Sequence, residues 1–358
     1  MAVSASKPLP HSAGYAAEQA SWRVKQILLI AGVVALAIYY NTVGWKSPAA
    51  MGIGAVRTVP PWKWGLLDFI AVEAGFLVLI YFILRLTPTA MTIAKATFQE
   101  TVRRKVLLVI LIFALVAIAA VTIFSWLSLG EEEKFIRDIG LGAVLFFGML
   151  ISVVLGAWLI PLEIERKTIF TLLAKPVDRT QLILGKFVGT ALTLGANVLA
   201  MWLVFTVAYY LKRHTVEEGQ IWLSLLNNTK AIFLTYCALV LLASVAITVS
   251  ILASQVVAVV VTFFVYFTGL LGGQLRHAGD ELIELSKRTG NAFNAILGQS
   301  LKVVYWLLPR LDNFDISSRL VLEDPVGFNY MWQTIAWGIL YTGAVLVIAW
   351  MFLDSREF

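Results

Sequence analysis

The chain has 358 residues, of which 59% are hydrophobic and only 14% are charged, and its mean hydropathy is +0.83. An ordinary soluble domain is about half apolar and about a quarter charged, so this many apolar residues cannot all be buried in one water-soluble core. The composition therefore predicts an all-α polytopic membrane protein. The net charge of +6 comes from short basic clusters between apolar runs, a membrane-topology pattern that indicates no nucleic-acid partner.

A polar leader, residues 1–25, comes first and is expected in the cytoplasm. Eight apolar runs then have about the length of 20 residues that a helix needs to cross a bilayer. They are 26–45, 65–86, 106–127, 139–162, 187–211, 231–253, 256–273 and 330–353. The first run lacks a small-residue cleavage site, so we predict a retained span and no targeting peptide.

Basic clusters set the predicted orientation. Arg23 and Lys25 precede the first run, and Arg103, Arg104 and Lys105 precede the third. The positive-inside rule puts both clusters in the cytoplasm. With eight spans, both termini are then cytoplasmic and the acidic turn 131–133 lies outside.

Residues 87–105 connect the second and third runs. Thr87 and Pro88 are typical of a helix N-cap and first helical position. An apolar stripe follows at helical spacing: Met91, Ala94, Phe98 and Val102. We expect an amphipathic helix on the inner membrane surface, the alternative being a cytoplasmic extension of the third span.

Residues 163–186 form the next cytoplasmic connection. A short apolar helix, 169–173, is broken by Pro176. Asp178 and Gln181 then match a capping box, which predicts a new helix that runs into the fifth span. The segment should be a compact helical knob, the alternative being a basic loop that only fixes topology.

Residues 274–329 are the long outer segment. Apolar residues recur there at helical spacing until Pro309: Phe293, Leu297, Leu301, Val304 and Leu308. Such a helix should lie at the outer interface or cap the bundle.

Small residues predict close helix contacts within the spans. They are Gly148, Ser152 and Gly156; Ala191 and Gly195; and Gly269 with Gly273. We also expect Asn197 to form a hydrogen bond between helices.

Catalytic motifs are scarce. The phosphate-binding pattern GxxxxGK[ST] is missing, because Gly185-Lys186 is followed by Phe187. His11, His214, His277 and the single Cys237 have no metal-site spacing. We therefore expect no enzyme activity and no cofactor in this chain. Asp68 and Glu73, in or beside the second run, are candidates for a proton or substrate role or for simple hydrogen bonding near the outer interface.

One motif suggests an enzyme. Glu132-Glu133-x-x-x-Arg137 resembles the EExxxR signature of membrane-embedded CAAX-type proteases. In that family buried carboxylates act with histidines, but no histidine here has the expected setting. A membrane protease is therefore a low-ranked alternative.

The stretch from Glu163 to Lys186 resembles the cytoplasmic signature of ABC-2 type permeases, especially the subfamily that includes the permease of nitrous-oxide-reductase maturation clusters. Residues 98–105 and 308–315 are similar to other parts of that family. The likeness runs from about Ala94 to the C-terminus and implies a six-span core, 106–358, with two additional N-terminal spans in 26–86.

The resemblance implies that residues 163–186 dock into a separate ATP-binding subunit. The implied docking residues are Glu163, Glu165, Arg166, Lys167, Thr168, Leu172, Leu173, Lys175, Pro176 and Arg179. The basic members could make charged contacts, with Leu172 and Leu173 as apolar anchors.

The implied assembly has two permease copies, identical or related, in membrane lipid with two ATPase subunits that carry ATP and Mg. A bacterial cytoplasmic membrane and export are the implied location and direction. The main alternative is a membrane scaffold that moves no substrate and binds a partner through residues 274–329.

Overall fold

The computed structural model describes residues 88–125, 132–159, 179–211, 218–321 and 328–355. All of them belong to one compact unit of the chain, residues 47–358. Within these ranges every regular element is a helix, which confirms the all-α fold. The leader 1–25 and the first two predicted spans lie outside the described residues.

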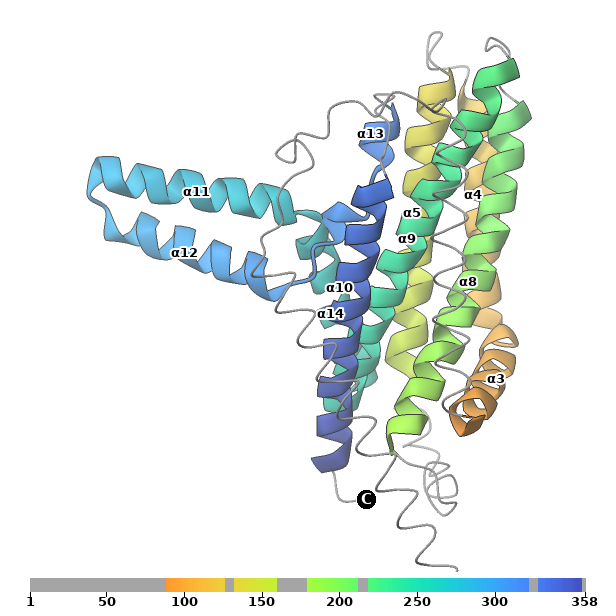
Figure 1. Ribbon diagram of the computed structural model, residues 1–358, viewed down its shortest axis with the longest axis horizontal. Coiled ribbons are helices and arrows are strands. Elements are labelled where there is room, and N and C mark those ends of the chain that lie inside the picture. The colour runs from red at the N-terminus through yellow and green to blue at the C-terminus, as the bar shows by residue number, and fades with distance from the viewer. Residues whose placement is uncertain (1–87, 126–131, 160–178, 212–217, 322–327, 356–358) are drawn as a thin grey trace, which may run out of the picture. The chain divides into compact units, whose positions relative to one another are not determined.

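Each of the six predicted core spans coincides with one helix (Figure 1). The helices are α4 (Lys105–Phe124), α5 (Glu132–Leu159), α8 (Arg179–Leu211), α9 (Glu218–Leu252), α10 (Gln255–Leu270) and α14 (Phe328–Ser355). Five of them are long and apolar enough to cross a membrane.

The exception is α10, which has only 16 residues. It reaches the length of a span only together with α11 (Gly272–Thr289), across a bend of 67°. The seventh predicted span, 256–273, was therefore wrong at its outer end, because the helix stops at Leu270 and the chain turns before Gly272.

Helix α9 is the centre of the bundle. It packs against α5, α8, α10 and α14, and 72% of its most apolar window is buried by protein. The peripheral helices α4 and α14 bury only 22% and 17% of theirs, so most of their apolar surface is left for lipid. This contrast explains why apolar content alone did not show which spans are central.

The seam between α5 and α9 uses the predicted small residues. A Cβ atom added to Gly148 or Gly156 would collide with Leu239 or Ala246 of α9. Ser152 lies between the two glycines, and its Oγ donates a hydrogen bond of 2.8 Å to the carbonyl of Leu239. The predicted close approach is confirmed here, and its partner is a helix of the same chain.

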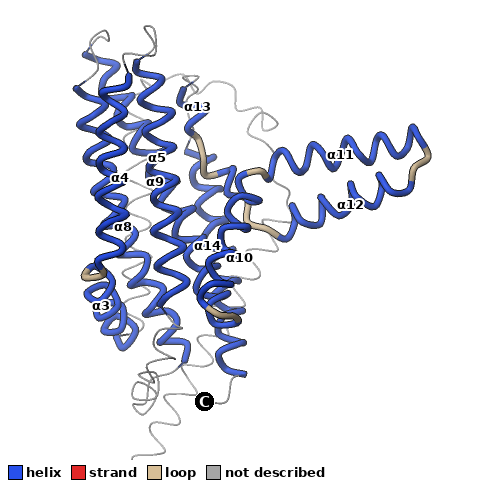
Figure 2. The backbone as a smooth tube through the Cα atoms, turned by 180° about the vertical axis from the view of Figure 1, so that it is seen from behind, coloured by secondary structure: helices blue, strands red, loops and turns tan. Residues whose placement is uncertain are grey.

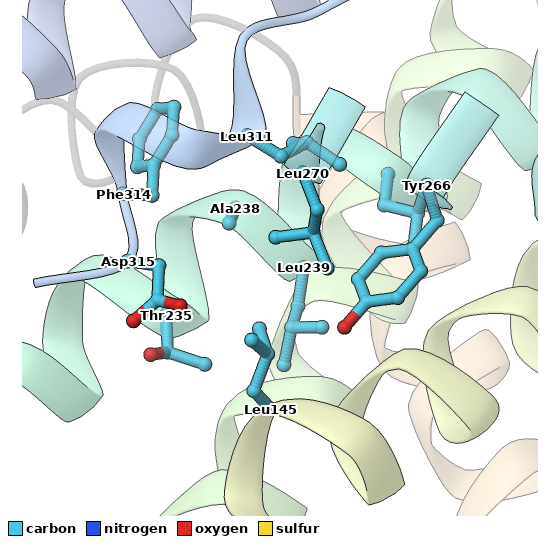
Figure 3. Close-up of a pocket in the computed structure, with 10 residues that line it drawn as sticks. Leu145, Thr235, Ala238, Leu239, Tyr266, Leu270, Leu311, Phe314 and Asp315 are labelled. Carbon is cyan, nitrogen blue, oxygen red and sulfur yellow. The ribbon is translucent and has the colours of Figure 1, made fainter. Parts of the chain in front are cut away.

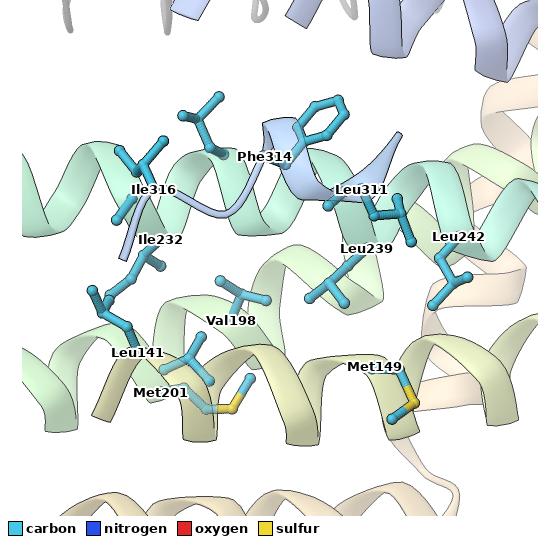
Figure 4. Close-up of a cluster of buried hydrophobic side chains, with 14 of the residues drawn as sticks. Leu141, Met149, Val198, Met201, Ile232, Leu239, Leu242, Leu311, Phe314 and Ile316 are labelled. Carbon is cyan, nitrogen blue, oxygen red and sulfur yellow. The ribbon is translucent and has the colours of Figure 1, made fainter. Parts of the chain in front are cut away.

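Figure 4 shows the main core, in which α5, α8 and α9 contribute most of the side chains. Met149, Val198 and Leu239 come one from each of these helices. The core is closed by the chain after α12 (Ala292–Leu307), where Leu311 and Phe314 are only 3% and 1% exposed. Leu311 belongs to the 3-10 helix η3 (Leu311–Asn313), which is followed by α13 (Ser317–Val321).

The predicted outer segment therefore divides into two parts. Residues 311–320 cap the bundle, because Leu311, Phe314, Ile316 and Leu320 are buried. Helices α11 and α12 (Ala292–Leu307) form an antiparallel hairpin that projects from the bundle (Figures 1 and 2). The hairpin turns at Gly290, whose φ of 69° favours glycine.

Candidate functional site

The predicted docking segment joins two long spans of the bundle. Helix α5 ends at Leu159 and α8 begins at Arg179, at the end of the bundle that also carries α3 (Pro88–Val102) and the last residues of α14 (Figure 1). Asp178, the predicted N-cap of this helix, lies outside the described residues, so the helix start that the capping box predicts stays a prediction.

Most of the predicted docking residues are also outside the described residues. They are Glu163, Glu165, Arg166, Lys167, Thr168, Leu172, Leu173, Lys175 and Pro176. Arg179 is placed as the first residue of α8. The structure thus describes α5 and α8, the helices on either side of the predicted docking segment, and the contacts of the segment itself stay a prediction.

Helix α3 lies directly against the first half of α8. A Cβ atom added to Gly185 would be 2.8 Å from the carbonyl oxygen of Ala90, and one on Gly189 would be 2.7 Å from that of Ala94. These distances are too short for any other residue, so the two glycines allow the backbones to touch.

A buried hydrogen bond continues this seam between α3 and α8. The hydroxyls of Thr101 and Thr193 are 2.7 Å apart, and both side chains are buried. The sequence carried a signal for this contact, the spacing Gly185-xxx-Gly189 followed by Thr193. The small residues predicted to allow close contact in this helix are instead Ala191 and Gly195.

Ala191 and Gly195 face α9 without an unusually close approach. The Tyr236 hydroxyl donates to the Ala191 carbonyl at 3.1 Å, and a Cβ on Gly195 would make an ordinary contact with the Tyr236 ring at 3.5 Å. Asn197 was also predicted wrongly, because its amide donates within α8, to the Thr193 carbonyl at 2.7 Å.

The side chains of α3 divide into a buried set and an exposed set. Ala90, Ala94, Thr97 and Thr101 are buried against the bundle. Met91 and Val102, from the predicted apolar stripe, are exposed, and so are Lys95 and Arg103. The predicted stripe is thus divided, since Met91 and Val102 are exposed whereas Ala94 is buried against the bundle. Thr97 and Thr101 of the buried face were missed because they are polar.

Helix α3 is also separate from α4. The backbone at Arg104 is extended, with φ −75° and ψ 115°, so the helix does not continue into Lys105. This break rules out the alternative in which residues 87–105 simply extend the third span. The connecting helix ends at Val102, three residues before the predicted boundary of 105, with a turn at Arg103.

The other side of α8 is held by an apolar cluster near the same end. Ile183 packs there with residues from the last turns of α9 and α14: Ile247, Ile251, Leu346, Ala349 and Leu353. Lys186, one turn beyond Ile183, is only 2% exposed. The beginning of α8 is thus fixed between α3 on one side and α9 with α14 on the other.

The EExxxR motif has a structural role at the opposite end of the bundle. Arg137 is 7% exposed, and its guanidinium donates to Glu133 and to the Tyr209 hydroxyl, both at 2.7 Å, and to the Leu320 carbonyl at 2.9 Å. These bonds join α5 to α8 and to α13. Tyr209 also donates to Glu133, so this carboxylate is engaged in holding helices together.

Only some of the other candidate residues lie in the part of the chain that the structure describes. Glu132 accepts a hydrogen bond of 3.3 Å from Ser125. Among the described residues, no three His, Cys, Asp or Glu side chains gather closely enough to hold a metal ion. Asp68, Glu73, His11 and His214 are outside the described part of the chain.

A cavity beneath η3 is small and mostly apolar (Figure 3). It is lined by residues of α5, α9, α10 and the chain around η3, with Thr235, Tyr266 and Asp315 as its polar members. It has room for about one water molecule. The cavity is therefore too small for an organic ligand.

Long apolar helices around a buried helical centre define a multi-pass α-helical membrane protein. The chain belongs to the ABC-2 family of transporters, since the family model described as "ABC-2 family transporter protein" matches residues 91–348. The match begins in the first turn of α3, includes α4, α5, α8, α9 and α10, and ends within α14. No curated protein matches the chain.

Family membership makes the chain the membrane-spanning permease subunit of an ABC transporter. Members of this family are transmembrane components and do not themselves hydrolyse ATP, and they associate with an ATP-binding subunit. The protease alternative loses its main support, because Glu133 and Arg137 pair with each other in a structural network.

Proposed function

We propose that the chain is the permease of an ATP-driven exporter and that residues 163–186 couple it to a separate ATPase. The observation that supports this most strongly is the close packing of α8 against α3. The segment leads directly into α8, whose first turns contact the backbone of α3 at Gly185 and Gly189. A displacement of the segment would therefore move α8 and α3 together.

The proposed mechanism uses two rigid levers. ATP-driven closure of two ATPase subunits would displace the docking segment of each permease copy, and α5 and α8 would tilt with it. The α5–α9 seam, closed by small residues and the Ser152 hydrogen bond, would carry the motion into the centre of the bundle. The transport path would lie between two copies, identical or related.

Charge reversal tests the docking proposal. In the double variant Lys175→Glu/Arg179→Glu, we expect loss of copurification with the ATPase and loss of permease-stimulated ATP hydrolysis, because the introduced glutamates would repel the acidic groups that Lys175 and Arg179 are proposed to contact. The matched control is Lys287→Glu/Arg288→Glu, which makes the same charge change at exposed positions of α11.

The control should retain full ATPase binding. If ATPase binding survives both the charge reversal and a deletion of residues 168–179, the docking assignment is wrong. If the Lys287/Arg288 control also loses binding, the effect is one of overall charge, which would equally contradict a specific docking role.

Export is the direction that the family resemblance favours. The substrate could be a lipid, a glycan, a peptide, a drug or a species used in metalloenzyme maturation. Inverted membrane vesicles should accumulate the substrate when ATP is added outside, whereas right-side-out vesicles should not. ATP-dependent uptake only by the right-side-out vesicles would contradict export.

A further inference from the structure

The turn between α3 and α4 carries three consecutive basic residues. Arg103, Arg104 and Lys105 follow one another where α3 ends and α4 begins. The extended backbone at Arg104, with φ −75° and ψ 115°, separates the two helices. Arg103 and Lys105, on either side of this break, are both exposed.

One of the three basic residues already has an acidic partner. The Arg104 guanidinium donates to the Glu100 carboxylate at 2.7 Å, and Glu100 is the single acidic residue of α3. Lys95, Arg103 and Lys105 form no ion pair with any residue that the structure describes. Three basic side chains are therefore left without a counter-ion in the described part of the chain.

Lys95 belongs to the same exposed surface of α3. Lys95 and Arg103 are roughly 80° apart around the helix axis. Both lie on the side opposite Ala94 and Thr101, which are buried against the bundle. Val102, which is 50% exposed, lies next to Lys95 on this side of the helix. Basic side chains beside an exposed apolar residue are typical of a helix at a membrane surface.

The length of α4 sets the depth of the turn in the membrane. Helix α4 has 20 residues, so it rises about 30 Å, which is the thickness of a bilayer core. Only 22% of it is buried by protein, so it faces lipid over most of its length. Lys105, its first residue, therefore lies where lipid chains give way to headgroups. Figure 1 places this end of α4 beside α3.

We propose that Arg103 and Lys105, together with Lys95, bind the phosphate of an anionic lipid in the leaflet at the α3 end of the bundle. A guanidinium can donate two parallel hydrogen bonds to one phosphate, and each basic side chain near the surface adds to the attraction for anionic lipid. A zwitterionic lipid carries its own cation beside the phosphate, so it competes less well.

Membrane topology alone does not require this arrangement. The positive-inside rule needs basic residues in the connecting segment, wherever their side chains point. Here Glu100 occupies Arg104, and the helix break leaves the neighbouring basic side chains exposed at the depth of lipid phosphates. The fold thus presents a basic cluster, Lys95, Arg103 and Lys105, to the headgroups.

Lipid-selective fluorescence quenching tests this proposal in the full chain. Val106, 46% exposed and next to Lys105, is replaced by cysteine in a Cys237→Ser background and labelled with bimane. The protein is placed in phosphatidylcholine nanodiscs that contain a small fraction of nitroxide-labelled lipid, either phosphatidylserine or phosphatidylcholine. The nitroxide is on the acyl chain, close to the headgroup. Phe264→Cys, on the exposed face of α10, carries the reference probe in separate samples.

We expect phosphatidylserine to quench the Val106 probe at least several-fold more strongly than phosphatidylcholine does at the same mole fraction. The two lipids should quench the Phe264 probe equally, which also shows that the protein is inserted. In Arg103→Gln/Lys105→Gln, the preference at Val106 should fall to near equality. In the parent it should weaken as the NaCl concentration rises, because salt screens the attraction.

The matched control is Lys287→Gln/Arg288→Gln, which removes the same charge at exposed positions of α11 and should retain the preference. Equal quenching by the two lipids in the parent, or a preference that survives Arg103→Gln/Lys105→Gln or high salt, would overturn the proposal. Loss of the preference in the control would show an effect of overall charge and would overturn it as well. So would displacement by millimolar inorganic phosphate, which would assign the basic cluster to a soluble anion. None of these measurements depends on the ATPase partner.

Discussion

A single methyl group at Gly189 should weaken the seam between α3 and α8. In Gly189→Ala, the new Cβ would be 2.7 Å from both the Ala94 carbonyl oxygen and the Thr97 Cβ. Neither atom can rotate away, because one belongs to the backbone and the other is attached directly to it. Overpacking of this kind costs about 1–3 kcal/mol.

The matched control is Gly142→Ala, also in the interior of a span. A Cβ on Gly142 would meet nothing within 4 Å. Both variants gain about 1 kcal/mol of helix propensity, so the difference between them isolates the overpacking. We expect Gly189→Ala to be the less stable of the two by about 1–3 kcal/mol.

Thermal unfolding of the purified permease in detergent measures this difference. For a chain of this size, about 1 kcal/mol lowers the Tm by a few degrees. Gly189→Ala should also reduce ATPase stimulation more than Gly142→Ala does, if α3 and α8 move together. Equal Tm values for the two variants would refute the close-packed seam.

Three further substitutions test other contacts. Arg137→Met should lower stability by about 2 kcal/mol in thermal unfolding, since a buried pair loses one partner and Glu133 is only partly solvated. Adding Glu133→Gln to this variant should restore part of the lost stability, and an undiminished Tm in Arg137→Met alone would contradict the network. Ser152→Ala should cost about 0.6 kcal/mol, a typical interhelical hydrogen bond in a membrane, and a loss of several kcal/mol would show a larger role. The hydrogen bond from Lys302 holds the pKa of Asp280 below its ordinary value. The ionised carboxylate therefore stabilises the hairpin above the unfolded-state pKa, and this stabilisation is lost as the pH falls through the lower folded-state pKa. Spin-label distances between α11 and α12 should widen on acidification in the parent but show no pH dependence in Asp280→Asn.

The positions of the spans were predictable because bilayer thickness fixes their length. Six apolar runs in the described part of the chain coincide with α4, α5, α8, α9, α10 and α14. The outer end of α10 was not predictable in this way, because the apolar run continues to Gly273 beyond the bend.

The role of Glu133 and Arg137 could not be decided from spacing alone. Two acidic residues and an arginine match a protease motif, yet the pattern also suits a helical ion pair at positions i and i+4. Tyr209 and the Leu320 carbonyl complete the network from 72 and 183 residues away in sequence. Only the folded chain brings these groups together.

The sequence by itself determined the class of the protein, the core spans and the basic segment that joins the fourth to the fifth. These features depend on the length of the apolar runs, which must match the bilayer thickness, and on the basic clusters, which set the orientation of the spans. The tertiary structure decided which surfaces meet: Gly185 and Gly189 against α3, and α9 at the centre of the bundle. Lipid and protein interior are both apolar, so hydrophobicity cannot tell a lipid-facing side chain from a packed one.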